Sequence, residues 1–254
     1  MSVDFGSELD EQVAIVTGAS SGIGEATAKA LAARGASVVV AARRETELQE
    51  LQAQIEAEDG DALVVPTDIT SDDDIDALVD ATLDEYGRID ILVNNAGYMP
   101  LTHIGDADRE TLQTTIDVNL RGLITLTHAV IPTMREQESG HVVNLSSVAG
   151  RFLIENGSHY NAAKAGVKIF GDSLRLDVAA EGIRVATIEP GSVATELLED
   201  IPNEEIQQEI KQYTGSMRSL RPEDIARTIT FVVSKPEHMD INEILVRPTD
   251  QVQP

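Results

Sequence analysis

The chain contains no cysteine among its 254 residues, which excludes disulfides and thiolate chemistry. No apolar run approaches the ~18 residues that a transmembrane helix requires. Residues 1–10 are acidic and lack the apolar stretch of a secretory signal, so we expect them to form an N-terminal tail. Together these absences favour a cytoplasmic protein.

Basic residues are scarce, because 19 Lys and Arg stand against 44 Asp and Glu and leave a formal net charge of −25. An acidic surface repels phosphate backbones and anionic lipid, so we expect neither nucleic acid nor membrane as a partner. Salt would screen the repulsion among the scattered acidic residues. We interpret this charge as adaptation to a very salty cytoplasm, as in halophiles; the alternative is an ordinary acidic protein.

Paired metal-ligand spacings are absent as well, so we predict no metal site. His159 directly precedes Tyr160, and this adjacency is only a weak indication of a substrate contact. The five histidines are His103, His128, His141, His159 and His238.

Short apolar runs alternate with helical patterns along the chain, and 42% of its residues are hydrophobic. Such alternation is typical of βαβ units, so we predict one α/β domain over residues 1–254, a Rossmann-type doubly wound parallel sheet. The expected strands are 13–17, 38–42, 62–66, 89–93, 141–145 and 183–188. The expected helices are 24–34, 45–58, 71–86, 109–134 and 160–180, with Ser71 able to cap the third.

The segment 194–215 interrupts this alternation after the sixth strand. Ligands of open α/β sheets bind beyond the carboxyl ends of the strands, so this segment is well placed to be a substrate lid. A solvated surface helix is an equally good interpretation.

A glycine-rich loop joins the first strand to the first helix. Its spacing is Gly-x3-Gly-x-Gly, and glycines there let the backbone approach a pyrophosphate at the positive end of the helix. We therefore predict phosphate binding by Gly18, Ser20, Ser21, Gly22, Ile23 and Gly24.

Tyr160 and Lys164 are four residues apart, which places them on one face of a helix. A phenol is a poor proton shuttle at neutral pH because its pKa is ~10. A neighbouring ammonium would stabilise the phenolate and lower that pKa, making Tyr160 a usable general acid/base.

These features occur in the order and spacing of the short-chain dehydrogenase/reductase family, which the chain resembles from about Gln12 to Val246, in the compact one-domain branch. The motifs that carry the resemblance are the glycine loop, Asn94-Asn-Ala-Gly97, Asn119, Ser147, Tyr160 with Lys164, and Pro190-Gly191.

The resemblance implies a role for each of four catalytic residues. Ser147 would polarise the substrate, Tyr160 would be the general acid/base, and Lys164 would lower its pKa and hold the nicotinamide ribose. Asn119 would anchor a water that links Lys164 to solvent. Of the adjacent serines we choose Ser147 over Ser146, because it precedes Tyr160 by the family interval of thirteen residues.

The end of the second strand bears on the choice of cofactor. Ala42 stands where NAD-preferring relatives carry Asp, and Arg43 and Arg44 follow it. Because arginine matches a phosphate with its planar fork, we predict NADP(H), with NAD less favoured. The resemblance adds further cofactor contacts at Asp68, Ile69, Asn95, Ala96, Gly97, Pro190, Gly191, Val193 and Thr195.

The function implied is an NADP(H)-dependent oxidoreductase that interconverts a small or medium alcohol and its carbonyl. Residues 240–249 look like those of a subgroup acting on 3-hydroxy acids. The alternatives are a non-enzymatic NADP(H)-sensing regulator and a 3-oxoacyl thioester reductase. The pocket for a small-molecule substrate would be built by residues 98–103, 151–158 and the lid. The family's usual assembly implies a homotetramer through the helices 109–134 and 160–180.

Overall fold

The computed structural model describes residues 9–252, which form a seven-stranded parallel sheet. The strands are β1 (Val13–Thr17), β2 (Ser37–Ala42), β3 (Asp61–Pro66), β4 (Ile91–Asn94), β5 (Gly140–Leu145), β6 (Ile183–Pro190) and β7 (Glu243–Val246). Their order in the sheet is β3-β2-β1-β4-β5-β6-β7, so the winding direction reverses between β1 and β4. This order confirms the predicted Rossmann-type doubly wound sheet.

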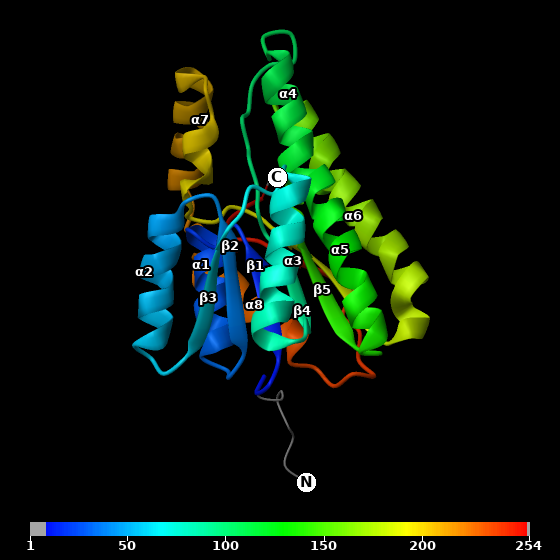
Figure 1. Cartoon of the computed structure of the whole chain (residues 1–254). Coiled ribbons are helices and arrows are strands. Elements are labelled where there is room, and N and C mark those ends of the chain that lie inside the picture. The colour runs from blue at the N-terminus through cyan, green and yellow to red at the C-terminus, as the bar shows by residue number, and fades with distance from the viewer. Residues whose placement is uncertain (1–8, 253–254) are drawn as a thin grey trace.

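Helices cover both faces of the sheet (Figure 1). The helices on one face are α1 (Gly22–Ala32), α2 (Glu45–Glu56) and α8 (Pro222–Val233). Those on the other face are α3 (Asp72–Tyr86), α5 (Gly122–Glu136) and α6 (Ser158–Val178). Ser71 caps α3 as predicted, since its side chain accepts a hydrogen bond from the backbone N–H of Asp74.

Alternate residues of each strand pack under different helices, because successive side chains of a strand point to opposite faces. Val38 and Val40 of β2 join the apolar cluster beneath α1, α2 and α8, whereas Val39 and Ala41 join the cluster beneath α3, α5 and α6. A strand covered on both faces is an unbroken apolar run in the sequence. For this reason the first six strands were predictable to within about two residues at each end.

Two elements at one side of the domain were not predicted, namely β7 and α8. β7 pairs only with β6 among the described strands, and its residues alternate between exposed and half-buried. An edge strand of this kind lacks the continuous apolar run by which the others were found. α8 begins at Pro222 and packs against α1 through Ile225 and Ile229.

The predicted helix 109–134 is interrupted by a change of helical register. It consists of α4 (Arg109–Ile116), the π-helical turn η1 (Asp117–Arg121) and α5, which continues to Glu136. In η1 the backbone N–H of Gly122 donates to the carbonyl of Asp117, five residues back. Short π turns of this kind are frequent at functional sites. Here the turn contains the buried Asn119.

The 194–215 segment forms the short 3₁₀ helix η4 (Glu196–Asp200) and the helix α7 (Glu204–Gly215). Asn203 caps α7 by accepting hydrogen bonds from the backbone of Glu205 and Ile206. α7 rises beyond the carboxyl ends of the strands, as does α4 (Figure 1). The segment therefore lies on the side of the sheet where ligands of this fold bind.

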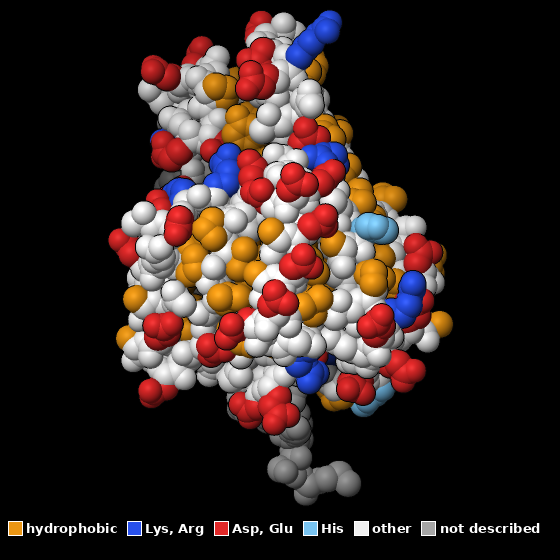
Figure 2. Space-filling model, viewed as in Figure 1, with side chains coloured by type: hydrophobic (Ala, Val, Ile, Leu, Met, Phe, Trp, Pro, Cys, Tyr) orange, Lys and Arg blue, Asp and Glu red, His pale blue; other side chains and the backbone are white. Residues whose placement is uncertain are grey.

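Acidic side chains are spread over the surface, as Figure 2 shows for one face. Among residues 9–252 no helix is long and apolar enough to cross a membrane, and no cluster of His, Asp and Glu has the geometry of a metal site. Most of the predicted tail, residues 1–10, lies outside the described residues. Its described end is not a tail, because Leu9 is fully buried and its N–H donates to the carbonyl of Arg34.

Candidate active site

A cavity of about 1190 Å³ opens at the carboxyl ends of the strands. Its size suits a dinucleotide together with a small substrate, since ligand cavities typically measure ~300–1000 Å³. Most predicted site residues line it; Gly24 and Asn119 do not. The predicted residues that line it are Gly18, Ser20, Ser21, Gly22, Ile23, Arg43, Arg44, Asp68, Ile69, Asn95, Ala96, Gly97, Ser147, Tyr160, Lys164, Pro190, Gly191, Val193 and Thr195.

The glycine loop needs its glycines for conformation and for close packing. Gly18 and Gly22 have φ angles of +63° and +56°, which side-chain-bearing residues rarely adopt. A Cβ on Gly24 would lie 2.2 Å from the carbonyl oxygen of Gly18. The loop is therefore folded back against the first turn of α1, leaving its open side toward the cavity. This geometry fits the pyrophosphate of a dinucleotide.

Asn95, at the end of β4, holds the same loop from the other side. Its amide nitrogen donates to the carbonyls of Thr17 and Gly18, at 2.9 and 3.3 Å. Its backbone N–H donates to the hydroxyl of Thr17 at 2.9 Å. Asn95 thus fixes the spacing between β1 and β4 where the winding reverses. Asn95 also lines the cavity, and its contact with a cofactor stays a prediction.

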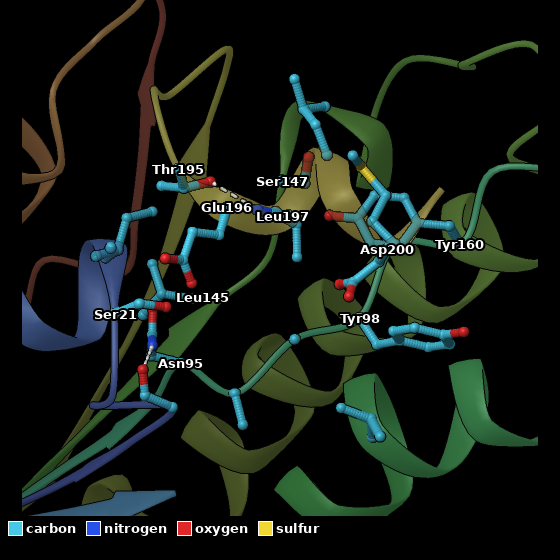
Figure 3. A pocket seen from close by; sticks show the side chains of 18 of the residues that line it. Ser21, Asn95, Tyr98, Leu145, Ser147, Tyr160, Thr195, Glu196, Leu197 and Asp200 are labelled. Carbon is cyan, nitrogen blue, oxygen red and sulfur yellow. Dashed lines mark hydrogen bonds between the residues drawn. The ribbon is translucent and has the colours of Figure 1, made fainter. Parts of the chain in front are cut away.

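Tyr160 and Lys164 lie near the start of α6, one turn apart and almost fully buried. The ammonium of Lys164 lies 5.8 Å from the centroid of the Tyr160 ring. It donates a hydrogen bond to the carbonyl of Leu145, at the end of β5, over 2.9 Å. The predicted convergence of the two side chains is thus present, with the lysine anchored to the sheet (Figure 3 shows Tyr160, Ser147 and Leu145).

Burial shifts the pKa values of both Tyr160 and Lys164. Burial raises the pKa of its phenol to about 12, and the hydrogen bond with Ser147 lowers it only in part. Burial also lowers the pKa of Lys164 to about 8. In the chain by itself burial is the largest influence on this phenol, so the lowering of its pKa by Lys164 stays a prediction for the site with its cofactor.

The two serines after β5 have different partners. Ser146 is buried and its hydroxyl donates to the backbone carbonyl of Lys164 at 2.8 Å, which ties the strand to α6. Ser147 is half-buried, interacts with the Tyr160 hydroxyl and accepts from the N–H of Ala149. Of the two, Ser147 is the serine that can share a substrate oxygen with Tyr160.

Asn119 lies behind the cavity wall. Its amide nitrogen donates to the carbonyls of Tyr98 and Thr115, at 2.7 and 2.9 Å, and its oxygen accepts from the N–H of Tyr98 at 3.3 Å. These bonds hold the loop after Gly97 in place. A Cβ built on Gly97 would lie 3.5 Å from the Asn119 oxygen and 3.9 Å from the Lys164 ammonium, so the three residues are close neighbours.

Two arginines follow β2 and face the cavity in different ways. Arg43 makes no side-chain hydrogen bond or ion pair with any residue in 9–252, and its charge acts on Asp68 and Asp200. Arg44 is bonded at each of its three nitrogens, because its guanidinium donates to Ser20, Ser21 and Glu196. This pairing of the second arginine with an acidic residue of η4 was not predicted.

Asp68, after β3, has a structural role in the turn that leads into α3. Burial raises the pKa of its carboxyl, but hydrogen bonds from Thr70 and the charge of Arg43 outweigh this and lower it overall. The carboxylate accepts from the N–H and the hydroxyl of Thr70 at 2.9 and 2.7 Å. It therefore shapes the turn into α3 while its neighbour Ile69 lines the cavity.

The segment after β6 closes the cavity opposite the glycine loop. Thr195 packs on that loop, since a Cβ on Gly22 would lie 3.1 Å from its methyl group. Gln251 was missed by the sequence analysis. Its side-chain oxygen accepts from the N–H of Ser192 at 2.9 Å, and a Cβ on Gly191 would collide with it. No local motif surrounds Gln251, so nothing in the sequence indicated this contact.

The substrate end of the cavity agrees only in part with the prediction. From the expected loops, Tyr98, Met99, Leu101 and Ile154 line it, and Val148 lines it without having been predicted. Residues 151–158 otherwise line a separate cavity of about 600 Å³, so most of that predicted wall was wrong. His159 is also outside the main cavity and contacts the carbonyl of Pro100 at 3.1 Å. Further wall residues that were not predicted are Asp108, Glu110, Thr111, Thr114 and Val118.

The 194–215 segment contributes to the same wall. Leu197, Leu198 and Asp200 of η4 and Ile210 and Tyr213 of α7 line the cavity. In Figure 3 the side chains of Glu196, Leu197 and Asp200 project from this segment toward Ser21, Tyr98 and Tyr160. α7 itself has no fully buried residue, so both predicted descriptions hold in part: it is a solvated helix whose inner side covers the cavity.

A glycine-loop cradle beside a paired tyrosine and lysine defines a dinucleotide-dependent oxidoreductase class. Residues 12–206 match the family model described as short chain dehydrogenase. An uncharacterised oxidoreductase of Listeria innocua is 39% identical over 249 residues, covering 96% of this chain and 98% of its own. The chain therefore belongs to the short-chain dehydrogenase/reductase family and is an oxidoreductase acting on CH–OH groups.

Solved structures agree with this assignment. A metagenomic short-chain oxidoreductase in complex with NADP is 32% identical, with a TM-score of 0.82, and the match covers 96% of this chain and 99% of that one. The closed form of a serine dehydrogenase complexed with NADP⁺ is 33% identical, with a TM-score of 0.85 and coverage of 92% and 94%. These neighbours support a nicotinamide cofactor for this chain.

Proposed function

We propose that the protein is an NADP(H)-dependent oxidoreductase that interconverts a small or medium alcohol and its carbonyl, with Tyr160 as general acid/base. The observation that carries this proposal is the meeting of the Tyr160 hydroxyl with Ser147 on the wall of a cavity that also contains the glycine loop. A bound nicotinamide would supply or accept the hydride.

Side chains of the protein transfer the proton to or from the substrate oxygen. In reduction Tyr160 donates a proton to the carbonyl oxygen, and in oxidation its phenolate accepts the proton of the alcohol. Ser147 shares the same substrate oxygen and holds it beside the phenol. Lys164 would stabilise the phenolate and hold the ribose of a bound cofactor, and Asn119 positions the backbone of Tyr98 from behind the cavity wall.

NADP(H) is favoured over NAD(H) by the end of β2. Ala42 offers no carboxylate to repel a 2′-phosphate, while Arg43 and Arg44 line the cavity next to it. In a chain with 19 basic and 44 acidic residues, two adjacent arginines at this position are a specific supply of positive charge. Two related structures of over 30% identity contain NADP, which supports the same choice.

The cavity wall favours a neutral or cationic alcohol over a 3-hydroxy acid. The lining residues from 98–118 and 197–214 include four carboxylates and no Lys or Arg. They would repel a carboxylate substrate, although Arg43 lies nearby. The four are Asp108, Glu110, Glu199 and Asp200.

The test is a spectrophotometric screen in molar KCl that follows NADPH with aldehydes, ketones and keto acids. Wild-type protein should reduce at least one neutral carbonyl, and Tyr160→Phe should lose turnover by about three orders of magnitude or more while still binding NADPH. Tyr98→Phe is the matched control, since this phenol also lines the cavity but lies away from Ser147 and should keep most activity. NADPH binding without turnover on any substrate would favour a regulator instead.

We further propose that the protein is a homotetramer working in a salty cytoplasm. Ile169 and Leu176 of α6 expose 66% and 74% of their surface, which supports an interface along this helix. Light scattering in molar salt should give four times the mass of the 27.3 kDa chain, and a monomer would reject the assembly.

A further inference from the structure

Arg44 is held by partners from the glycine loop and from η4, and a carboxylate oxygen of Glu47, three residues further along, lies 3.9 Å from its Nε. Its Nε donates to the Ser20 hydroxyl at 3.1 Å, one Nη to the Ser21 hydroxyl at 2.8 Å, and the other Nη to the carboxylate of Glu196 at 3.2 Å. Each guanidinium nitrogen therefore already has an acceptor. A guanidinium has five N–H groups, so two remain for a phosphate, but a phosphate bound there would lie beside the negative charge of Glu196.

The partners differ in what they can do when a phosphate arrives. The hydroxyls of Ser20 and Ser21 can rotate and become donors to phosphate oxygens, since a hydroxyl both donates and accepts. The carboxylate of Glu196 only accepts, and its negative charge repels the phosphate. The side chain of Glu196 is 65% exposed, so it can turn into solvent when the phosphate binds.

We propose that Glu196 is a specificity-determining residue that competes with the 2′-phosphate of NADP(H) for Arg44, so that phosphate binding releases the first turn of η4. This inference rests on the proposed NADP(H) preference. It adds that binding of the 2′-phosphate must break the contact between Glu196 and Arg44. Glu196 directly follows Thr195, which packs on Gly22 and caps η4. Losing the Glu196–Arg44 contact therefore loosens the segment that also carries Leu197, Leu198 and Asp200 into the cavity.

The first experiment measures binding of the fragments 2′,5′-ADP and 5′-ADP, so it is independent of turnover. Glu196→Gln should bind 2′,5′-ADP about three- to fivefold more tightly than wild type, as expected for loss of an exposed ion pair, and should bind 5′-ADP unchanged. Glu199→Gln is the matched control, because it removes the same charge from the same segment but from a carboxylate that pairs with Lys211. It should leave the ratio of the two affinities unchanged.

The second experiment follows hydrogen–deuterium exchange of a peptide covering Glu196–Asp200. In wild type 2′,5′-ADP should speed its exchange and 5′-ADP should not; in Glu196→Gln the exchange should be fast without either fragment. Equal affinity ratios for wild type and Glu196→Gln would overturn the inference and assign the phosphate to Arg43. If neither protein distinguishes the two fragments, the NADP(H) preference falls as well.

Discussion

The ammonium of Lys164 lies 2.9 Å from the carbonyl oxygen of Leu145, so the central residue of the site is tied to the last residue of β5. The same strand end continues into Ser146 and Ser147, of which the first bonds the backbone of Lys164 and the second the hydroxyl of Tyr160. The end of β5 and the start of α6 are therefore bonded to each other at Tyr160 and Lys164.

The two serines should differ in their effect on pH dependence. Because the hydrogen bond with Ser147 lowers the pKa of Tyr160, Ser147→Ala should move the pH at which alcohol oxidation reaches half its maximum to a higher value, and lower kcat by about 100-fold. The sign follows from the phenolate, the form that accepts the proton. Ser146→Ala should leave the pH profile in place even if it lowers stability, and equal shifts in both variants would contradict the assignment.

Gly24→Ala should weaken cofactor binding by about tenfold or more, because its Cβ would meet the backbone of Gly18 and displace the loop. Titration with NADPH would measure the change. Gly215→Ala is the control, since nothing lies within 4 Å of a Cβ at that position. Wild-type affinity in Gly24→Ala would show that the loop does not need this close approach.

Ala42→Asp should shift the preference toward NAD(H). A carboxylate at the end of β2 would repel a 2′-phosphate and accept hydrogen bonds from a ribose. We expect the ratio of kcat/KM for NADPH to that for NADH to fall by about 100-fold, a change of ~2.7 kcal/mol. Unchanged ratios would contradict the cofactor assignment.

His141 should make the fold sensitive to acid. Burial, with the charge of Arg184, lowers the pKa of this imidazole to about 3, whereas an unfolded histidine titrates near ~6.5. Between these values the unfolded state binds the extra proton, so the free energy of unfolding decreases as pH falls from ~6.5. His141→Leu should flatten that decrease and remove two buried nitrogens that have no hydrogen-bond partner among residues 9–252.

Urea unfolding at pH 4.5–7 would measure this effect. An unchanged slope in His141→Leu would show that other groups set the acid response.

Salt should stabilise the protein strongly. Repulsion within a net charge of −25 is screened within ~3 Å at 1 M salt, so the melting temperature should rise by ~10 °C or more between dilute buffer and molar KCl. Sucrose of equal osmolality is the control for non-ionic effects. A midpoint that does not respond to KCl would refute the halophilic interpretation.

Features encoded by a short stretch of sequence were predictable, whereas contacts between residues far apart in the chain were not. Buried parallel strands are apolar runs, and the loop, tyrosine and lysine are short motifs, so each carries its own signal. β7 is half-exposed and carries none. The contact of Arg44 with Glu196 joins residues 152 positions apart, and it depends on how η4 packs against the glycine loop. The pKa of Tyr160 likewise depends on the depth of burial, which no motif encodes.

The π-helical turn at Asp117–Arg121 sets a limit on how this chain can be shortened. Each residue of an α-helix rotates the chain by ~100°, so trimming one residue here to restore uniform winding would swing α4 around its own axis relative to α5. Asn119 would then leave Tyr98, and the α4 residues facing the cavity would turn outward. Deleting even one residue from this helix would therefore disturb the cavity wall, whereas a surface loop tolerates deletions.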